Sequence, residues 1–157
     1  MRGAPSGRYL HRIDVETEIV ISRPRELVSR YAADPGNATE WYENIESVEW
    51  ETPPAIAVGS RMAFVARFLG RRLAYVYEIK ELEPGERLVM ATTDGPLAME
   101  TTYSWEDAGD GATLMRLRNR GKPSGFSRLL APFMGIAVRR ANRKDLERLQ
   151  ELLESDG

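Results

Sequence analysis

The sequence predicts an α+β domain in which an antiparallel sheet of seven strands packs against one long C-terminal helix. Three observations support this fold class. A run of strand-like segments alternates apolar and polar side chains between tight turns. The final thirty or so residues instead repeat apolar side chains at spacings of three and four. Two short helical segments lie between the first and second strands.

The composition is that of one globular domain. The chain has 157 residues, of which 42% are hydrophobic and 29% charged, and its net charge is −2. We interpret residues 1–10 as a flexible leader and residues 11–157 as a single domain. No apolar stretch is long enough to span a membrane, and the leader lacks the apolar core of a signal peptide. A cytoplasmic location is therefore expected.

The residue inventory excludes several kinds of chemistry. There is no cysteine, and the one histidine, His11, lies at the edge of the predicted domain. Disulfides, thiol catalysis and multi-histidine metal sites are thereby excluded, and a Ser-His-Asp triad is disfavoured. The net charge gives no attraction to nucleic acid. We expect neither a metal nor a cofactor.

The first third of the chain begins with alternating apolar and polar residues and continues with two segments that are predicted to be helical. Ser22 is suited to cap a helix, Pro24 fits its first turn, and the sequence Asp34-Pro35-Gly36-Asn37 breaks it. The predicted elements are a strand at 11–22, helices at 24–33 and 38–44, and a second strand at 45–51.

Five further strands follow the loop at residues 52–59. The turns between them, such as Asp94-Gly95 and Asp110-Gly111, are too short for crossover helices. The strands therefore form an antiparallel meander. Their predicted ranges are 61–69, 72–82, 87–93, 97–106 and 113–120.

Residue parity separates two faces of this sheet. The apolar face should meet the long helix, and the charged face should meet water. The charged face includes Arg116, Arg118 and Arg120, which cross-strand ion pairs on a solvated face explain better than nucleic-acid binding.

The long helix is predicted over residues 126–154, with Pro132 either kinking it or marking the start of its main segment. Its apolar stripe includes Phe133, Ala137 and Ala141, continuing into leucines near the C-terminus. Asp145 is assigned to the solvated side with the helix's basic residues. The small residues on the stripe leave space between helix and sheet.

This order of elements is a helix-grip fold, and the chain from about His11 resembles the START-like (SRPBCC) superfamily, specifically its polyketide cyclase/dehydrase-like branch. The resemblance implies a curved seven-stranded antiparallel sheet wrapped round the helix, with an apolar cavity between them. In such a fold the seventh strand lies between the first and sixth, so that Arg116, Arg118 and Arg120 face carboxylates on both sides, namely Glu16, Glu18, Glu100 and Glu106. The resemblance also implies the binding of lipids, sterols, polyketides or other hydrophobic molecules, with a minority of enzymes. The segments that carry it are Ile19–Ile21 with Pro24 and Val28, Asp34-Pro35, Trp41, Gly59, Glu81 with Pro84, and Arg118-Asn119-Arg120-Gly121.

We predict that methionine and aromatic side chains line this cavity, because methionine adapts to varied apolar guests. The alternative is that the same side chains fill a solid core. The small residue Ala137 should face the cavity, so that Ala137→Trp is predicted to abolish binding. The predicted ligand-binding residues are Trp41, Met62, Phe64, Phe68, Tyr75, Tyr77, Met90, Met99, Tyr103, Met115, Asn119, Phe133, Met134 and Ala137.

Three functions are consistent with the sequence. The first is binding of a hydrophobic small molecule or lipid, by a monomer or homodimer. The second is a cyclase or dehydratase that uses tyrosine and asparagine groups; no catalytic residue is assigned, because the predicted inner face has no charged side chain. The third is a protein-interaction module with a vestigial cavity. A charged group inside the cavity would favour the enzyme, whereas a collapsed cavity with an exposed apolar patch would favour the interaction module.

Overall fold

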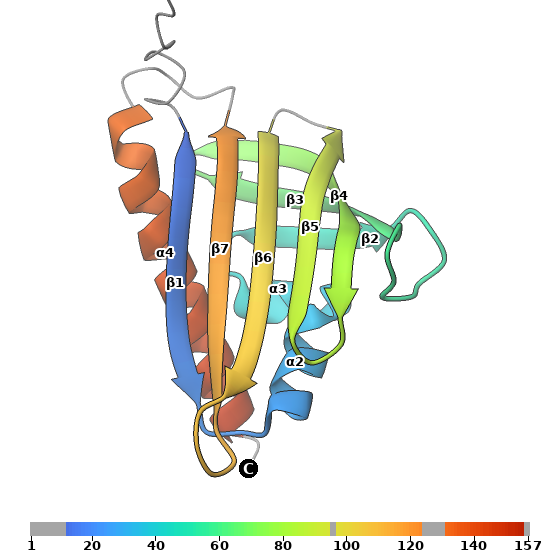
Figure 1. Cartoon of the computed structure of the whole chain (residues 1–157). Coiled ribbons are helices and arrows are strands. Elements are labelled where there is room, and N and C mark those ends of the chain that lie inside the picture. Colours follow the sequence, from blue (N-terminus) through green and yellow to red (C-terminus); the bar gives the residue numbers. More distant parts are fainter. Residues whose placement is uncertain (1–11, 95–96, 124–130, 156–157) are drawn as a thin grey trace, which may run out of the picture.

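A computed structural model describes residues 12–94, 97–123 and 131–155, and it confirms the predicted fold class. Seven antiparallel strands form one sheet in the order β1-β7-β6-β5-β4-β3-β2 (Figure 1). The proposed leader and His11 lie outside the described residues. The strands are β1 (Ile13–Ile21), β2 (Ile45–Trp50), β3 (Arg61–Phe68), β4 (Arg71–Glu83), β5 (Arg87–Asp94), β6 (Leu97–Asp107) and β7 (Thr113–Pro123).

The helices lie together on one side of the curved sheet (Figure 1). The longest, α4, has Pro132 in its first turn, so this proline starts the helix rather than kinking it. Between β1 and β2, the Asp34 side chain caps a short 3-10 turn by accepting from the Gly36 amide at 2.9 Å. The elements are α2 (Arg25–Ala33), η1 (Pro35–Asn37), α3 (Ala38–Trp41) and α4 (Ala131–Ser155).

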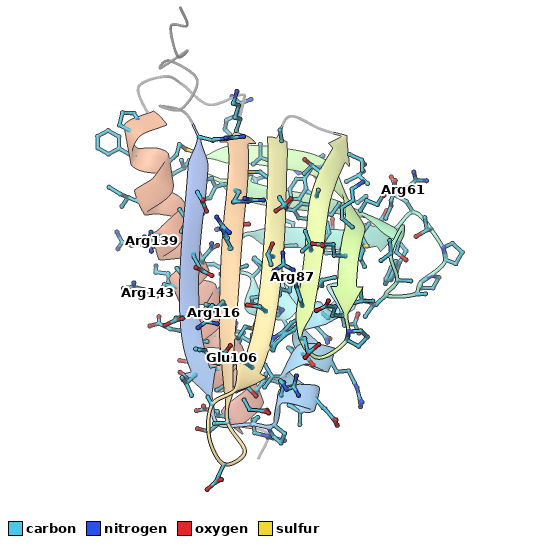
Figure 2. All side chains as sticks on the ribbon, viewed as in Figure 1. Arg61, Arg87, Glu106, Arg116, Arg139 and Arg143 are labelled. Carbon is cyan, nitrogen blue, oxygen red and sulfur yellow. The ribbon has the colours of Figure 1, made fainter. Side chains whose placement is uncertain are left out.

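The convex face of the sheet carries the expected ion pairs (Figure 2). Arg116 pairs with Glu18 at 3.1 Å and with Glu106 at 3.2 Å. Arg120 pairs with Glu100 at 2.7 Å. Arg118 differs from the expectation, because it takes Asp14 at 2.8 Å although Glu16 is opposite it in the register. The arginines of β7 are therefore held by neighbouring strands.

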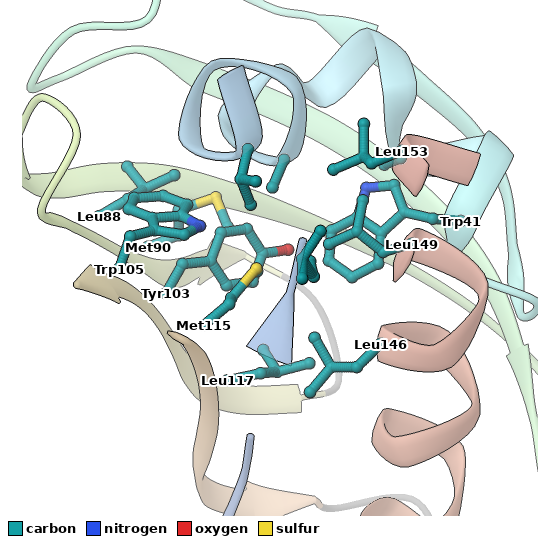
Figure 3. Packing of buried hydrophobic residues seen from close by; sticks show 14 of the residues in the cluster. Trp41, Leu88, Met90, Tyr103, Trp105, Met115, Leu117, Leu146, Leu149 and Leu153 are labelled. Carbon is teal, nitrogen blue, oxygen red and sulfur yellow. The ribbon is translucent and has the colours of Figure 1, made fainter. Parts of the chain in front are cut away.

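Most of the interior below the concave face is solid. The largest cluster joins Trp41 of α3, Trp105 and Met115 of the sheet, and the leucines of the C-terminal half of α4 (Figure 3). Leu149 is fully buried there. A smaller cluster at the other end of α4 contains Met134 and other apolar residues, namely Ile13, Val15 and Val138. The two clusters leave a space between them.

Gly121 on β7 allows close approach of the neighbouring strand. Its φ is 152°, and a Cβ atom built there would lie 2.0 Å from the Ala98 carbonyl oxygen and 2.9 Å from Met99. A side chain at this position would push β6 away from β7. The glycine therefore sets the strand spacing where Met99 reaches the interior.

Candidate ligand cavity

An apolar cavity of about 150 Å³ lies between the sheet and α4. Its walls come from the middle strands, from the α2–α3 region and from the first half of α4. An apolar space of this size is enough for a benzene-sized molecule. Nine of the predicted ligand-binding residues line it: Phe64, Phe68, Tyr75, Tyr77, Met90, Met99, Tyr103, Asn119 and Met134.

Three other predicted residues, Trp41, Met62 and Met115, are buried in the large cluster and do not line the cavity. Met62 and Met115 are buried on the inner face as expected, but each comes earlier in its strand than the residues that line the cavity. Trp41 packs with Tyr42 and Tyr103, at ring-centroid distances of 4.2 and 5.7 Å, and these tyrosines rather than Trp41 reach the cavity. Parity identifies the face of a strand but not the position along it where space remains.

The two remaining residues, Phe133 and Ala137, do not line the cavity: Phe133 faces solvent, and Ala137 lies at the cavity's flank. Phe133 is 61% exposed, and Ala137 is half-buried without lining the cavity. Cavity-facing residues in this half of the helix are Met134, Val138, Ala141, Asn142 and Asp145. Apolar periodicity gave the wrong rotation because this half of α4 exposes large apolar residues and buries polar ones. Of the two small residues expected to leave space, only Ala141 lines the cavity.

One set of polar groups in the cavity is a hydrogen-bonded chain across the middle strands. Thr101 donates its hydroxyl hydrogen to Asn119 Oδ1 at 2.6 Å. The Tyr77 hydroxyl lies 2.6 Å from Thr101 Oγ1 and must therefore donate to it, because a threonine hydroxyl has one hydrogen. Burial raises the pKa of Tyr77 to about 12. The chain is neutral near pH 7, and each of its hydroxyl hydrogens already has an acceptor.

A second polar pair joins α3 to the sheet. The hydroxyl oxygens of Tyr42 and Tyr103 are 2.6 Å apart. Burial raises the pKa of both tyrosines above its ordinary value, so neither is a base near pH 7. The pair can donate one further hydrogen bond, since two hydroxyl groups hold two hydrogens and their shared contact uses one.

The cavity also contains an ionisable residue, Asp145, that was predicted to lie on the solvent-exposed side of the helix. Asp145 is only 3% exposed and lines the cavity, and its Oδ1 accepts from the Glu43 amide at 3.1 Å. Burial raises the pKa of Asp145 to about 7, against the smaller opposing effect of the Glu43 hydrogen bond. Its carboxyl group can therefore exist in either protonation state near neutral pH.

Asn142 lies one turn before Asp145 and is 4% exposed. It also lines the cavity, and its side-chain nitrogen has no hydrogen-bond partner within the described part of the chain. Neither residue carries a sequence signal for this role: both are polar positions in a strongly charged segment. Only the position of α4 over the sheet shows that they face inward.

Other kinds of site receive no support from the described ranges 12–94, 97–123 and 131–155. They contain no group of three or more His, Asp or Glu side chains placed to hold a metal ion. Within the same ranges, no helix is both long and apolar enough to cross a membrane.

The helix-grip fold and its cavity place the chain among START-like domains, whose fold is suited to ligand binding. Residues 12–154 match the family described as polyketide cyclase/dehydrase and lipid transport. The chain belongs to this family, which confirms the resemblance. No curated protein matches the chain.

Solved structures with the same fold include three that illustrate its range. TTHA0849 from Thermus thermophilus is 20% identical, with a TM-score of 0.78 over 92% of this chain and 99% of its own. The Zhui aromatase/cyclase from Streptomyces sp. R1128 is 16% identical, with a TM-score of 0.74 over 92% and 94%. The di-domain aromatase/cyclase BexL of the BE-7585A biosynthetic pathway is 19% identical, with a TM-score of 0.69 over 90% of this chain and 46% of its own.

Proposed function

We propose that the protein binds a hydrophobic small molecule or lipid segment in the cavity between the sheet and α4. The observation that supports this most directly is the open space itself, lined by aromatic and methionine side chains in a fold otherwise packed solid. A protein-interaction module with a vestigial cavity is less well supported, because the cavity has not collapsed.

The size of the cavity limits how much affinity apolar contact can provide. Burying six carbon groups at about 0.8 kcal/mol each gives about 5 kcal/mol. Association itself costs at least about 4 kcal/mol. A ligand held at micromolar concentration therefore needs shape complementarity or polar contacts in addition.

Native mass spectrometry of the freshly purified protein, with its organic extract analysed alongside, tests the binding function. The expected result is a bound species that is released on denaturation. If the protein purifies without a ligand, calorimetric titration with 4-ethyltoluene, a one-ring apolar probe, serves as the test instead. An empty protein that also fails to bind this probe would contradict the proposal.

A matched pair of variants locates the binding site. Ala141→Phe places a ring in the cavity, whereas Ala137→Phe, one turn earlier, adds the same ring outside the cavity lining. We expect the first variant to lose the ligand and the second to retain it, with both melting cooperatively. Equal retention by the two folded variants would place the ligand elsewhere.

A second candidate function, an enzyme of cyclase or dehydratase type, is favoured by Asp145. A carboxyl group with a pKa of about 7 in an apolar cavity is suited to general acid–base catalysis. Its carboxylate would remove a proton from the carbon beside a ligand carbonyl, leaving the electron pair in an enolate. The carboxyl group would then exchange its proton with solvent and reprotonate the enolate carbon.

Deuterium exchange at the methyl group of acetophenone, followed by NMR in heavy water, tests this second function with a small aromatic ketone. An enzyme should accelerate exchange, and Asp145→Asn should remove the acceleration. Exchange at the same rate with wild type, variant and buffer would mean that the protein does not catalyse this proton transfer, and only the binding function would remain.

A further inference from the structure

The Asn142 side chain is an unused hydrogen-bond donor inside the cavity. It is 4% exposed, and its amide nitrogen has no partner among the described residues. Such a group is unfavourable in an empty protein, because its hydrogen bonds to water are lost and not replaced. It faces the same space as the apolar walls. The indole nitrogens of Trp41 and Trp105 are also buried without a partner, but they lie in the packed cluster, whereas the Asn142 donor faces space that an acceptor can enter.

Asp145 places an acceptor on the same face of the same helix, three residues further along. Residues spaced by three are neighbours on a helix surface. The Glu43 amide occupies Oδ1 of the carboxyl group, and Asp145 lines the cavity beside Asn142. The two side chains therefore offer a donor and an acceptor to one group of a ligand.

The chemistry of this pair distinguishes between ligand groups. An ammonium group would suit Asp145 but would leave the Asn142 nitrogen unpaired, because it has no acceptor. When Asp145 is ionised, it would repel a carboxylate and would find no hydrogen-bond donor on a ligand carbonyl, although either group could accept from Asn142. A hydroxyl group satisfies both partners, since its oxygen accepts and its hydrogen donates.

We propose that Asn142 and Asp145 together bind a hydroxyl group, so that the ligand is an alcohol or phenol whose apolar body fills the cavity. This inference rests on the proposed binding function and specifies its ligand class. The hydroxyl oxygen accepts from Asn142 Nδ2, and the hydroxyl hydrogen is donated to Asp145 Oδ2.

Most of the other polar groups in the wall already bond to one another, and the Tyr42–Tyr103 pair, which keeps one free hydroxyl hydrogen, is the competing site for a ligand hydroxyl. Asn119 and Thr101 bond to each other, and Tyr77 donates to Thr101. Tyr42 and Tyr103 share a hydrogen bond. Asp34 lies in the wall as a cap of the 3-10 turn, with its Oδ1 occupied by the Gly36 amide.

Calorimetric titration with 4-ethylphenol and 4-ethyltoluene at pH 7.5 tests the proposal. The two probes have nearly the same shape, and a hydroxyl in one replaces a methyl in the other. We expect wild type to prefer the phenol at least tenfold. Asn142→Leu should reduce the preference to about twofold or less while still binding 4-ethyltoluene. Asn37→Leu, at an asparagine outside the cavity lining whose side chain donates to the Tyr31 carbonyl, should retain the preference, and Asn119→Leu tests the other asparagine that the sequence predicted to bind ligand.

The outcomes distinguish a failure of the proposed binding function from a failure of the proposed hydroxyl site. Binding of neither probe to wild type would overturn the proposed function. Equal affinity for the two probes would overturn the hydroxyl site and leave the cavity function standing. Loss of the preference in Asn119→Leu but not in Asn142→Leu would place hydroxyl recognition on the sheet instead. Thermal melts establish folding of each variant, and Asn142→Ala provides a smaller replacement if leucine is not accommodated.

Discussion

The space between the sheet and α4 has two halves, of which one is filled by side chains and the other is open. Near the C-terminal end of α4, Leu146, Leu149 and Leu153 are buried in one cluster with tryptophan and methionine side chains (Figure 3). Nearer its start, the same helix presents Ala141, Asn142 and Asp145 to an open cavity.

Side-chain size and polarity account for this difference. Large apolar residues fill one half and provide the packing that holds α4 on the sheet. Small residues leave the other half unfilled, and the buried polar side chains of Asn142 and Asp145 there are unfavourable in an apolar core. We therefore expect stability to be concentrated at one end of the helix and the proposed ligand binding at the other.

The largest expected effect is on packing in the solid half. Leu149→Ala should lower the free energy of unfolding by about 4 kcal/mol, within the range for fully buried leucines. Met134→Ala, beside the cavity, should lower it by about half as much, because fewer neighbours surround its side chain. Urea denaturation measures both; equal losses would contradict the division into two halves.

The next effect is a pH dependence from Asp145. The unfolded aspartate releases its proton near pH 4, whereas the folded one holds it to about pH 7. The folded state therefore binds more protons between these values, and stability falls as pH rises through this window. This contribution lowers the free energy of unfolding by about 2–3 kcal/mol from pH 5 to pH 8, at 1.36 kcal/mol per pKa unit.

Asp145→Asn should remove this loss, because the amide oxygen still accepts from Glu43 and carries no charge. The variant should therefore match wild type at pH 5 and be more stable than wild type at pH 8. Denaturation of both proteins at the two pH values measures the difference. The same pH dependence in both proteins would mean that Asp145 titrates normally.

A third prediction compares overpacking in the two halves. Val28→Phe in the solid cluster should destabilise by about 2 kcal/mol, because no space is left for the ring. Ala141→Phe should change stability by less than about 1 kcal/mol, because its ring enters existing space. Thermal melts compare the two variants, and a strongly destabilised Ala141→Phe would show that the cavity cannot accept a ring.

The smallest expected effect concerns ligand affinity. Ionised Asp145 accepts a hydrogen bond more strongly than its protonated form. The affinity for 4-ethylphenol should therefore rise several-fold between pH 6 and pH 8, and that for 4-ethyltoluene should not. Calorimetry with wild type and Asp145→Asn measures this change. A rise that persists in the variant would assign the pH dependence to another group.

The sequence alone determined the order of elements, the two faces of the sheet and the ion pairs of Arg116 and Arg120. These features follow from alternation, turn chemistry and strand order, which are local or nearly so. Eight strand residues that were predicted to bind ligand accordingly lie in the cavity wall.

Tertiary structure alone decided which part of the interior remains empty and which face of α4 meets it. Phe133 and Ile136 are apolar but exposed, whereas Asn142 and Asp145 are polar but buried, so periodicity indicates the wrong face there. The partner of Asp145 is Glu43, 102 residues earlier in the chain. Because the burial of Asp145 depends on contacts between such distant segments, its position in the cavity could be established only once the helix was placed on the sheet.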